Sequence, residues 1–230
     1  FNLVYQRINP KEMKITNKNF QFVVCGTDTD VGKTLISSFL VRGLNCYYWK
    51  PIQSGIEGET DSQYVKRVSQ ISPKKILKEA YIFNNPVSPH WAAEIDKVKI
   101  IKSNLNLPNI DKSLLIETAG GLMVPITRDF LQIDQIKIWN LPVILVCRSS
   151  LGTLNHTLLS IEALRKRNIT ILGLFINGKK HLDNPQTLKL FSGLPIIAEF
   201  PLIKNFSVEN LDLLWKDLKM GETLNQILNK

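Results

Sequence analysis

An apolar run, a glycine-rich turn and the start of a helix follow one another near the beginning of this chain, and they constrain its fold most. The run covers residues 20–25, and the turn reads Gly26-Thr27-Asp28-Thr29-Asp30-Val31-Gly32-Lys33-Thr34. Apolar residues then recur at helical spacing to Leu44, which places Lys33 and Thr34 on the first turn of a helix. A helix start offers free N–H groups and a positive dipole end, which suit phosphate oxygens. The pattern predicts a P-loop that binds a nucleoside triphosphate.

The spacing of this turn differs from the usual P-loop. Five residues separate Gly26 from Gly32, where the usual motif has four. The alternative is a strand-to-helix turn with an incidental lysine, but the strand before and the helix after favour a P-loop. We expect the nucleotide to contact the stretch that ends the loop: Thr29, Asp30, Val31, Gly32, Lys33 and Thr34. Lys33 would reach the β- and γ-phosphates, and the Thr34 hydroxyl would ligate Mg²⁺.

Further apolar runs of strand length alternate with helical patterns along the rest of the chain. Strands are expected at 46–49, 113–117, 142–147, 169–176 and 195–198, and helices at 61–71, from 89, at 130–139 and at 153–167. This alternation predicts an α/β fold of the P-loop NTPase type, with a mainly parallel sheet covered by helices on both faces. We expect one domain over residues 13–230, preceded by an extension over 1–12 that carries no chemistry.

Charge and cysteine content narrow the class of protein. The chain has 29 lysine and arginine residues against 20 acidic ones, a formal charge of +9, but the lysines are scattered and not interleaved with aromatic residues. We therefore expect no nucleic-acid partner. No apolar run approaches the roughly 20 residues that span a bilayer, so no membrane association is expected. The three cysteines lie in apolar runs without metal-ligand spacing, as in a cytoplasmic protein with reduced core thiols.

Polar or glycine-rich residues follow several of the expected strands, where ligands of parallel sheets bind. They include Lys50, the stretch Glu117-Thr118-Ala119-Gly120-Gly121, Arg148 and Asn177. Lys50 could instead be a surface lysine, and Asp61 could merely cap the helix that follows it. Glu117 ends an apolar strand, and a carboxylate is costly to bury without a metal or cation partner. These residues are therefore candidates for one site.

Six motifs in order make the chain resemble the dethiobiotin synthetase family over about residues 22–201. They are the extended loop at 26–34 with its five-residue spacing, Lys50-Pro51-Ile52-Gln53-Ser54-Gly55, Asp61, Asn85-Pro86-Val87-Ser88-Pro89-His90, Glu117-Thr118-Ala119-Gly120-Gly121, and Leu151-Gly152-Thr153-Leu154-Asn155-His156. Thr118 stands where the family commonly has glycine. The resemblance implies an ATP- and Mg²⁺-dependent cyclo-ligase that converts 7,8-diaminononanoate and carbon dioxide to dethiobiotin through a carbamate and its phosphoric anhydride.

The resemblance also implies a role for each matched residue. Thr34, Asp61 and Glu117 would hold Mg²⁺, while Glu117, Gly120, Asn177 and Pro201 would add to the nucleotide site, Asn177 at the adenine edge. Lys33 and Lys50 would flank the γ-phosphate and the carbamate, and Thr27 and Ser54 would hydrogen-bond the carbamate and the substrate amines. Gly152, Leu154 and Asn155 would bind the substrate carboxylate from the partner subunit, which implies a homodimer with sites at the subunit interface.

Two rival functions deserve comparison with this one. An amidotransferase of cobalamin synthesis would need an added glutaminase domain with a nucleophilic cysteine, for which the expected domain leaves no room. A nucleotide-switch ATPase of the partitioning type usually carries an additional lysine early in its loop, and residues 26–31 contain none. The partitioning ATPase is the alternative that we retain.

Overall fold

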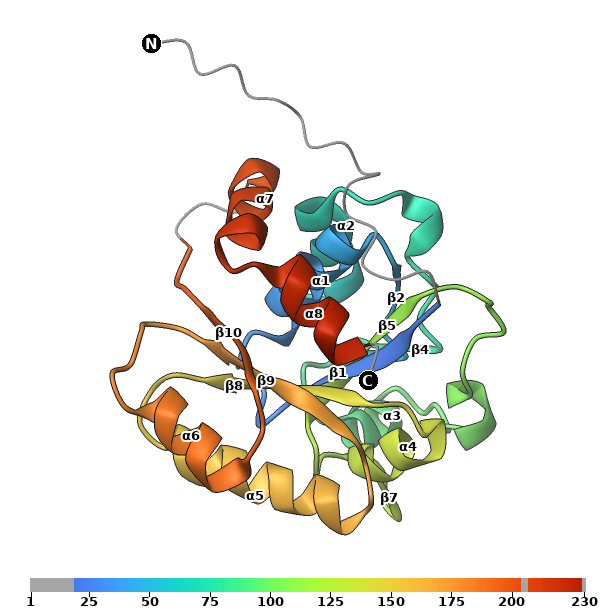
Figure 1. The fold of residues 1–230 in the computed structure, drawn as a ribbon. Helices are drawn as coiled ribbons and strands as arrows, with labels where there is room; N and C mark the ends of the chain where they lie inside the picture. The colour runs from blue at the N-terminus through green and yellow to red at the C-terminus, as the bar shows by residue number, and fades with distance from the viewer. Residues whose placement is uncertain (1–18, 204–206, 229–230) are drawn as a thin grey trace.

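A six-stranded parallel sheet forms the centre of the computed structural model, which describes residues 19–203 and 207–228. The strands run in the spatial order β10-β9-β8-β1-β5-β2 (Figure 1). Their bounds are β1 Gln21–Gly26, β2 Tyr47–Trp49, β5 Leu114–Gly121, β8 Val143–Arg148, β9 Ile171–Asn177 and β10 Ile196–Phe200. β5 and β8 flank β1 on opposite sides. The loops that follow these three strands therefore meet at one edge of the sheet.

Helices cover both faces of this sheet, because alternate residues of each buried strand point to opposite sides. In β1, Phe22 and Val24 belong to one apolar cluster, whereas Val23 and Cys25 belong to the other. Figure 1 shows α1, α2, α7 and α8 on one side of the sheet and α4, α5 and α6 on the other. These helices are α1 Lys33–Leu44, α2 Asp61–Ser69, α4 Gln132–Trp139, α5 Thr153–Lys166, α6 Asn184–Ser192, α7 Val208–Asp217 and α8 Met220–Leu228.

Smaller elements surround the edge of the sheet near β2 and β5. β3 Ile52–Ser54 pairs in parallel with β4 Tyr81–Phe83, and β6 Pro125–Thr127 pairs antiparallel with β7 Phe130–Leu131. Helix α3, Pro89–Ile95, packs with them, and single helical turns lie at Pro73–Lys75 and Lys102–Leu105. Residues from β3, β4, α3, β6 and β7 share a third apolar cluster. This unit builds one wall of the pocket described below.

The fold class expected from the sequence is confirmed, and each expected strand matches a strand of the sheet. The expected helix over 130–139 is wrong at its start, since Phe130 and Leu131 form a strand of a hairpin. Helix α4 begins at Gln132, where the Asp134 carboxylate accepts the backbone N–H of Leu131. β3, β4 and the helices α6, α7 and α8 were not expected. The extension over 1–12 lies outside the described residues.

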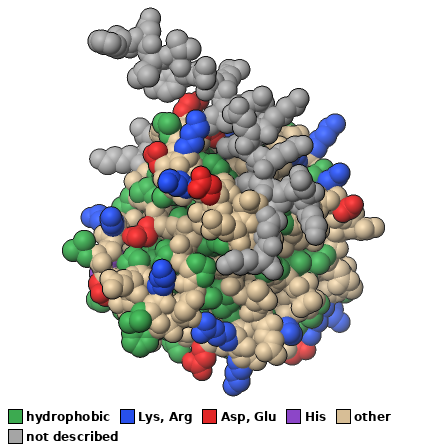
Figure 2. Space-filling view, in the orientation of Figure 1, with side chains coloured by type: hydrophobic (Ala, Val, Ile, Leu, Met, Phe, Trp, Pro, Cys, Tyr) green, Lys and Arg blue, Asp and Glu red, His purple; other side chains and the backbone are tan. Residues whose placement is uncertain are grey.

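The distribution of basic side chains and the length of the helices bear on the expectations about nucleic acid and membranes. On the face seen in Figure 2, lysine and arginine side chains are dispersed among acidic, polar and apolar ones. Within 19–203 and 207–228, none of the helices is both long and apolar enough to cross a membrane.

Candidate functional site

The residues of the glycine-rich loop between β1 and α1 pack closely against one another. Gly32 has a φ of 96° and ends the loop as the N-cap of α1, in a conformation that favours glycine. A Cβ at Gly26 would lie 2.8 Å from a methyl carbon of Val31, so a side chain there would clash. The Lys33 ammonium group donates to the Asp28 carbonyl at 2.8 Å. Gly32, Lys33 and Thr34 at the start of α1 line the cavity described below, with the lysine held by the loop itself.

Side chains at the ends of β8 and β9 hold this loop from outside. Arg148 donates to the Asp28 carboxylate at 2.9 Å, and the other carboxylate oxygen of Asp28 accepts the Thr29 N–H at 2.7 Å. Asn177 donates its amide to the Val31 carbonyl at 3.0 Å. A Cβ at Gly32 would lie 2.1 Å from the same Asn177 nitrogen. The neighbouring strands therefore help to determine the shape of the loop.

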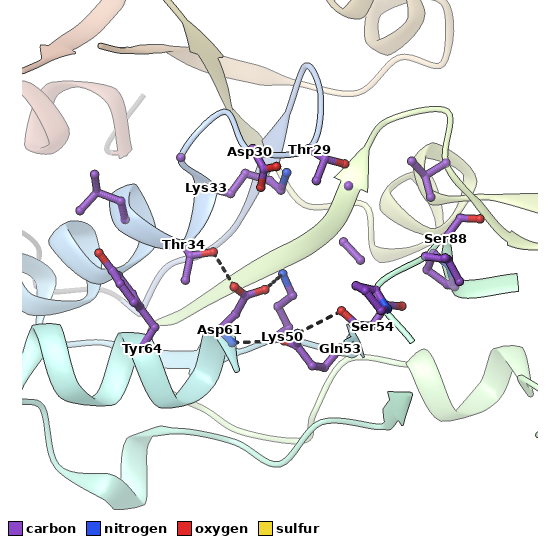
Figure 3. A pocket seen from close by; sticks show the side chains of 18 of the residues that line it. Thr29, Asp30, Lys33, Thr34, Lys50, Gln53, Ser54, Asp61, Tyr64 and Ser88 are labelled. Atoms are coloured by element: carbon purple, nitrogen blue, oxygen red, sulfur yellow. Dashed lines mark hydrogen bonds and ion pairs between the residues drawn. The ribbon is translucent and has the colours of Figure 1, made fainter. Parts of the chain in front are cut away.

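A cavity of about 740 Å³ opens at the carboxyl end of β1. Figure 3 shows its labelled lining, with Lys33 and Asp30 on one side and Lys50, Gln53 and Ser54 on another. The lining comprises Thr29, Asp30, Gly32, Lys33, Thr34, Leu35, Lys50, Gln53, Ser54, Glu59, Asp61, Tyr64, Pro86, Val87, Ser88, Pro89, Ala119, Gly120 and Val124. Its size suits a ligand as large as a nucleotide.

Four polar side chains, Thr34, Lys50, Asp61 and Glu117, form a cluster at the base of this cavity. Figure 3 labels three of them, Thr34, Lys50 and Asp61. The Thr34 hydroxyl lies 2.9 Å from both the Asp61 Oδ1 and the Glu117 Oε1 atoms. The Lys50 ammonium group forms ion pairs with Asp61 and, at 3.1 Å, with Glu117. Glu117 is completely buried and Lys50 is 3% exposed. Buried charges of this kind are stable only when they are paired and hydrogen-bonded.

Burial and neighbouring charges shift the pKa values of Lys50 and Asp61 in the cluster and of Lys33 beside it. Burial lowers the pKa of Lys50, but the carboxylates of Glu117 and Asp61 outweigh that effect and the pKa is raised. Burial alone would raise the pKa of Asp61, yet Lys50 and the Thr34 hydroxyl bring it below its usual range. Burial, followed by the charge of Lys50, lowers the pKa of Lys33 to about 8. Lys50 and Asp61 are therefore held in their charged forms.

Local structure explains how Asp61 and Lys50 reach the cluster. Asp61 is the first residue of α2, while Thr60 is the N-cap and forms a capping box with Gln63. The expectation that Asp61 might merely cap the helix is therefore wrong, because Thr60 does so and leaves the Asp61 carboxylate free to enter the site. Lys50 follows β2 directly, and the side-chain amide oxygen of Gln53 accepts the backbone N–H of Asp61 at 3.3 Å. β2, β3 and α2 thus converge on one point.

The donor set of Thr34, Asp61 and Glu117 fits Mg²⁺. It offers a hydroxyl and two carboxylates, the hard oxygen ligands that Mg²⁺ takes alongside water and phosphate oxygens. The two carboxylates are joined through hydrogen bonds to one Thr34 oxygen, so their oxygens lie close together. Within the described ranges no group of three or more His, Cys, Asp or Glu side chains is arranged for a metal. A metal at this site would therefore rely on phosphate and water to complete its ligands.

Several residues predicted for the site do not belong to the lining of the cavity. Thr27 and Val31 are part of the loop, and Asn177 holds the loop through Val31. Pro201 is exposed just after β10, and Gly152 is the N-cap of α5. Leu154 and Asn155 follow in the first turn of α5, where Asn155 is exposed and Leu154 half-buried. The remaining predicted residues line the cavity, except Glu117, which lies behind Thr34 and Lys50.

Other residues of the site did not emerge from the sequence. Gln53, Glu59, Tyr64, Val87 and Val124 line the cavity without having been singled out. Gln53 lies inside the matched motif at 50–55, and this position could have indicated that it belongs to the site.

Two buried side chains within β2 and β5 also come into view only in the structure. Thr118, which stands where glycine is common, directs its hydroxyl to the Val24 carbonyl at 3.5 Å and is accommodated inside the sheet. Tyr48 donates to Glu117 at 3.0 Å from behind the site. The spacing of Tyr48 and Lys50, two residues apart on one extended segment, predicts that they share a side of the sheet.

Comparisons with known proteins agree with this geometry. The model of a family described as an AAA domain matches residues 21–210. An ATP-dependent dethiobiotin synthetase of Brucella melitensis biotype 2 is 44% identical over 193 residues, which cover 84% of this chain and 91% of that protein. The enzyme of the same name from Rhodopseudomonas palustris strain HaA2 is 46% identical over 189 residues, 82% of this chain and 89% of that protein.

Solved structures are more distant. A nucleotide-binding protein from Archaeoglobus fulgidus in complex with ADP has a TM-score of 0.46 and 11% identity, and covers 94% of both chains. A ParA-family ATPase from Chlorobium tepidum has a TM-score of 0.46 and 9% identity, with 92% of this chain and 94% of that chain covered. Similarity this low is compatible with many activities, so we draw nothing about function from it.

Proposed function

Because this chain belongs to the ATP-dependent dethiobiotin synthetase family, we propose that its cavity joins 7,8-diaminononanoate to carbon dioxide at the expense of ATP. The chain is an ATP-dependent cyclo-ligase that forms dethiobiotin in biotin biosynthesis. The observation that best supports our assignment of the site is the buried cluster of Thr34, Lys50, Asp61 and Glu117 beside the P-loop. It gathers positive charge and hard oxygen ligands where an anionic reaction would need both.

The reaction that we propose proceeds through anions at every stage. One substrate amine attacks carbon dioxide and loses a proton, which forms a carbamate. A carbamate oxygen attacks the γ-phosphorus of ATP and ADP departs. The second amine then attacks the carbamate carbon, loses a proton and expels phosphate, which closes the cyclic urea. Catalysis of such a sequence depends on positioning and charge stabilisation rather than on a covalent nucleophile.

Lys33 and Lys50 are the cations available for this charge. Both line the cavity, at 7% and 3% exposure. Lys33 starts α1 beside the free backbone N–H groups, so we assign it to the β- and γ-phosphates together with residues 29–32 and Thr34. Lys50 comes from the opposite wall, between Asp61 and Glu117, and we assign it to the carbamate and the transferred phosphoryl group. Mg²⁺, held by Thr34, Asp61 and Glu117, supplies further charge neutralisation when bound.

Polar groups near Lys50 would receive the diamine. Ser54 lines the cavity, and its hydroxyl is buried and has no hydrogen-bond partner among the described residues. A buried hydroxyl without a partner is costly, so a ligand amine at this position would satisfy it. Thr27, at the first turn of the loop, is the second candidate for the carbamate. Gly120 and Pro201 are candidates for nucleotide contacts, and the amide oxygen of Asn177 is a candidate for the adenine edge.

The substrate carboxylate needs an anion site, which we assign to the start of α5 in a partner subunit. Gly152 is the N-cap of this 14-residue helix, and Leu154 and Asn155 lie in its first turn, where free N–H groups suit a carboxylate. They do not line the cavity of their own subunit. Leu151, next to them, is fully exposed, as expected of a segment that packs against a second copy. The proposed assembly is therefore a homodimer with shared sites.

The decisive experiment is a product assay with the wild-type protein. ATP, Mg²⁺, bicarbonate and 7,8-diaminononanoate are added, and dethiobiotin is measured by mass while ADP is measured in parallel. We expect dethiobiotin and ADP in equal amounts, and neither in excess of background when the diamine is omitted. ATP turnover that ignores the diamine, without a ureido product, would contradict the proposal and favour a switch ATPase.

A further inference from the structure

The hydroxyl of Tyr48 lies directly behind the charged cluster, on the side away from the cavity. Tyr48 is completely buried and pairs with Leu115 in the register between β2 and β5. Glu117 follows two residues later in β5, so its side chain points to the same side of the sheet as that of Leu115. The Tyr48 hydroxyl donates to the Glu117 Oε2 atom at 3.0 Å. Tyr48 is not part of the cavity lining.

The two oxygens of the Glu117 carboxylate have different partners. Oε1 accepts from the Thr34 hydroxyl at 2.9 Å and from Lys50 at 3.1 Å. Oε2 accepts from Tyr48 alone among the hydrogen bonds found within the described residues. The Oε1 atom therefore faces the groups proposed to bind nucleotide and metal, and the Oε2 atom is hydrogen-bonded to a side chain of the apolar core.

This division matters because the carboxylate of a glutamate rotates easily. The terminal torsion of a glutamate is broad and has no sharply preferred value, so the fold of β5 alone does not determine which way the carboxylate plane faces. A hydrogen bond to a charged acceptor is stronger than a neutral one, and the rigid tyrosine ring is held by core packing around Tyr48. The Tyr48 hydroxyl can thus hold the plane of the Glu117 carboxylate.

We infer that Tyr48 is a positioning residue, which holds Glu117 with its Oε1 atom presented to Thr34 and to the Mg²⁺ of the bound nucleotide. The inference rests on the proposed metal role of Glu117. Outer partners that orient a metal-ligating carboxylate commonly change metal affinity by tenfold or more when they are removed. Burial, reinforced by the charge of Glu117, raises the pKa of Tyr48 well above its ordinary value, so the phenol keeps the proton that it donates.

A purely structural role is the competing explanation. Tyr48 could satisfy a buried carboxylate and fill the core without affecting what Glu117 binds. Both roles predict that Tyr48→Phe lowers the thermal stability of the protein. Only the positioning role predicts a change in the Mg²⁺ dependence of nucleotide binding.

The test is a calorimetric titration of ADP at a series of MgCl₂ concentrations, with an EDTA sample as the metal-free reference. Tyr47→Phe is the matched control, because Tyr47 lies in the same strand, is half-buried, and packs in the apolar cluster on the other face of the sheet. We expect Tyr48→Phe to raise the Mg²⁺ concentration at half-effect about tenfold. Tyr47→Phe should match the wild type, and the affinity for ADP in EDTA should be equal in all three proteins.

A second comparison uses the Glu117→Gln background. There the addition of Tyr48→Phe should shift the Mg²⁺ half-effect by less than about twofold, because the two changes act through one contact. This double variant also lacks the buried charge, so it serves if Tyr48→Phe alone does not fold. A Mg²⁺ curve of Tyr48→Phe that coincides with that of the wild type, or an equal shift in the Glu117→Gln background, would overturn the inference. Failure of the proposed reaction is recognised separately, by absence of dethiobiotin from the wild-type assay.

Discussion

Two ion pairs border the nucleotide loop, and they differ in how far water reaches them. Lys50 and Glu117, at the base of the cavity, have side chains that are 4% and 0% exposed. Arg148 and Asp28, at the outer side of the loop, are 40% and 50% exposed. Their separations are similar, at 3.1 and 2.9 Å. Equal geometry therefore does not mean equal energy, because loss of a partner leaves a bare charge in the core but only a hydrated one at the surface.

The largest effect is expected at the buried pair. Lys50→Met keeps most of the side-chain volume but leaves Glu117 and Asp61 without their cation, so the free energy of unfolding should fall by about 3–5 kcal/mol. Urea unfolding measures this change. Lys102→Met is the matched control, since Lys102 pairs with Asp129 at the surface at 3.5 Å, and its cost should stay below about 1 kcal/mol. Equal costs for the two variants would contradict the comparison.

Lys50→Met, combined with Glu117→Gln, also separates the effect of Lys50 on stability from its effect on catalysis. In Lys50→Met/Glu117→Gln the carboxylate charge is removed as well, so a large part of the lost stability should return. Both variants should still bind ADP when assayed at a temperature where they are folded. Neither should form dethiobiotin at more than about one hundredth of the wild-type rate. Recovery of turnover in the double variant would show that Lys50 acts only as a structural counter-ion.

An effect of intermediate size on stability is expected at Cys46, a buried thiol away from the site. Cys46 is 1% exposed, and burial raises its pKa from 9.0 to about 12. Between these pH values the unfolded chain loses the thiol proton while the folded chain keeps it, so stability falls as pH rises through 9. At pH 10 the wild type should have lost about 1.4 kcal/mol relative to pH 8 from this group.

Cys46→Ala isolates that contribution, because other groups titrate equally in both proteins. The difference in unfolding free energy between wild type and Cys46→Ala should shrink by about 1.4 kcal/mol from pH 8 to pH 10. Guanidinium unfolding at the two pH values measures it. A difference that stays constant would mean that water reaches the thiol and that burial is a poor guide to ionisation in this core.

The smallest effect is expected at the exposed pair. Arg148→Gln should change the free energy of unfolding by less than about 1 kcal/mol, because water solvates the released Asp28 carboxylate. The remaining difference from the wild type should disappear in 1 M NaCl, where screening acts over roughly 3 Å. Urea unfolding at low and high salt checks both. A loss as large as that of Lys50→Met would show that the loop depends on Arg148 more than exposure indicates.

Prediction from the sequence worked best where one short segment carries the signal. The P-loop, the strand before it and the helix after it depend on neighbouring residues, so they were found correctly. The boundary at Phe130 was wrong because its apolar pattern fits a strand pairing with β6 as well as a helix. α7 and α8 were not expected at all. α7 packs against α1, for example at Trp215 beside Phe39, and α8 packs against β10. Both placements depend on contacts between segments far apart in the chain.

The sequence by itself determined the family, the P-loop and the set of chemical groups available to the site. These are properties of residue order, and 44% identity over most of the chain carries them. Only the tertiary structure decided which groups touch. Pairing of β2 with β5 brings Tyr48 and Lys50 onto Glu117, 69 and 67 positions away, and the capping of α2 by Thr60 releases Asp61 to join them. The sequence specifies which charged groups are present. Packing excludes water from them and so sets the strength of the interactions between them.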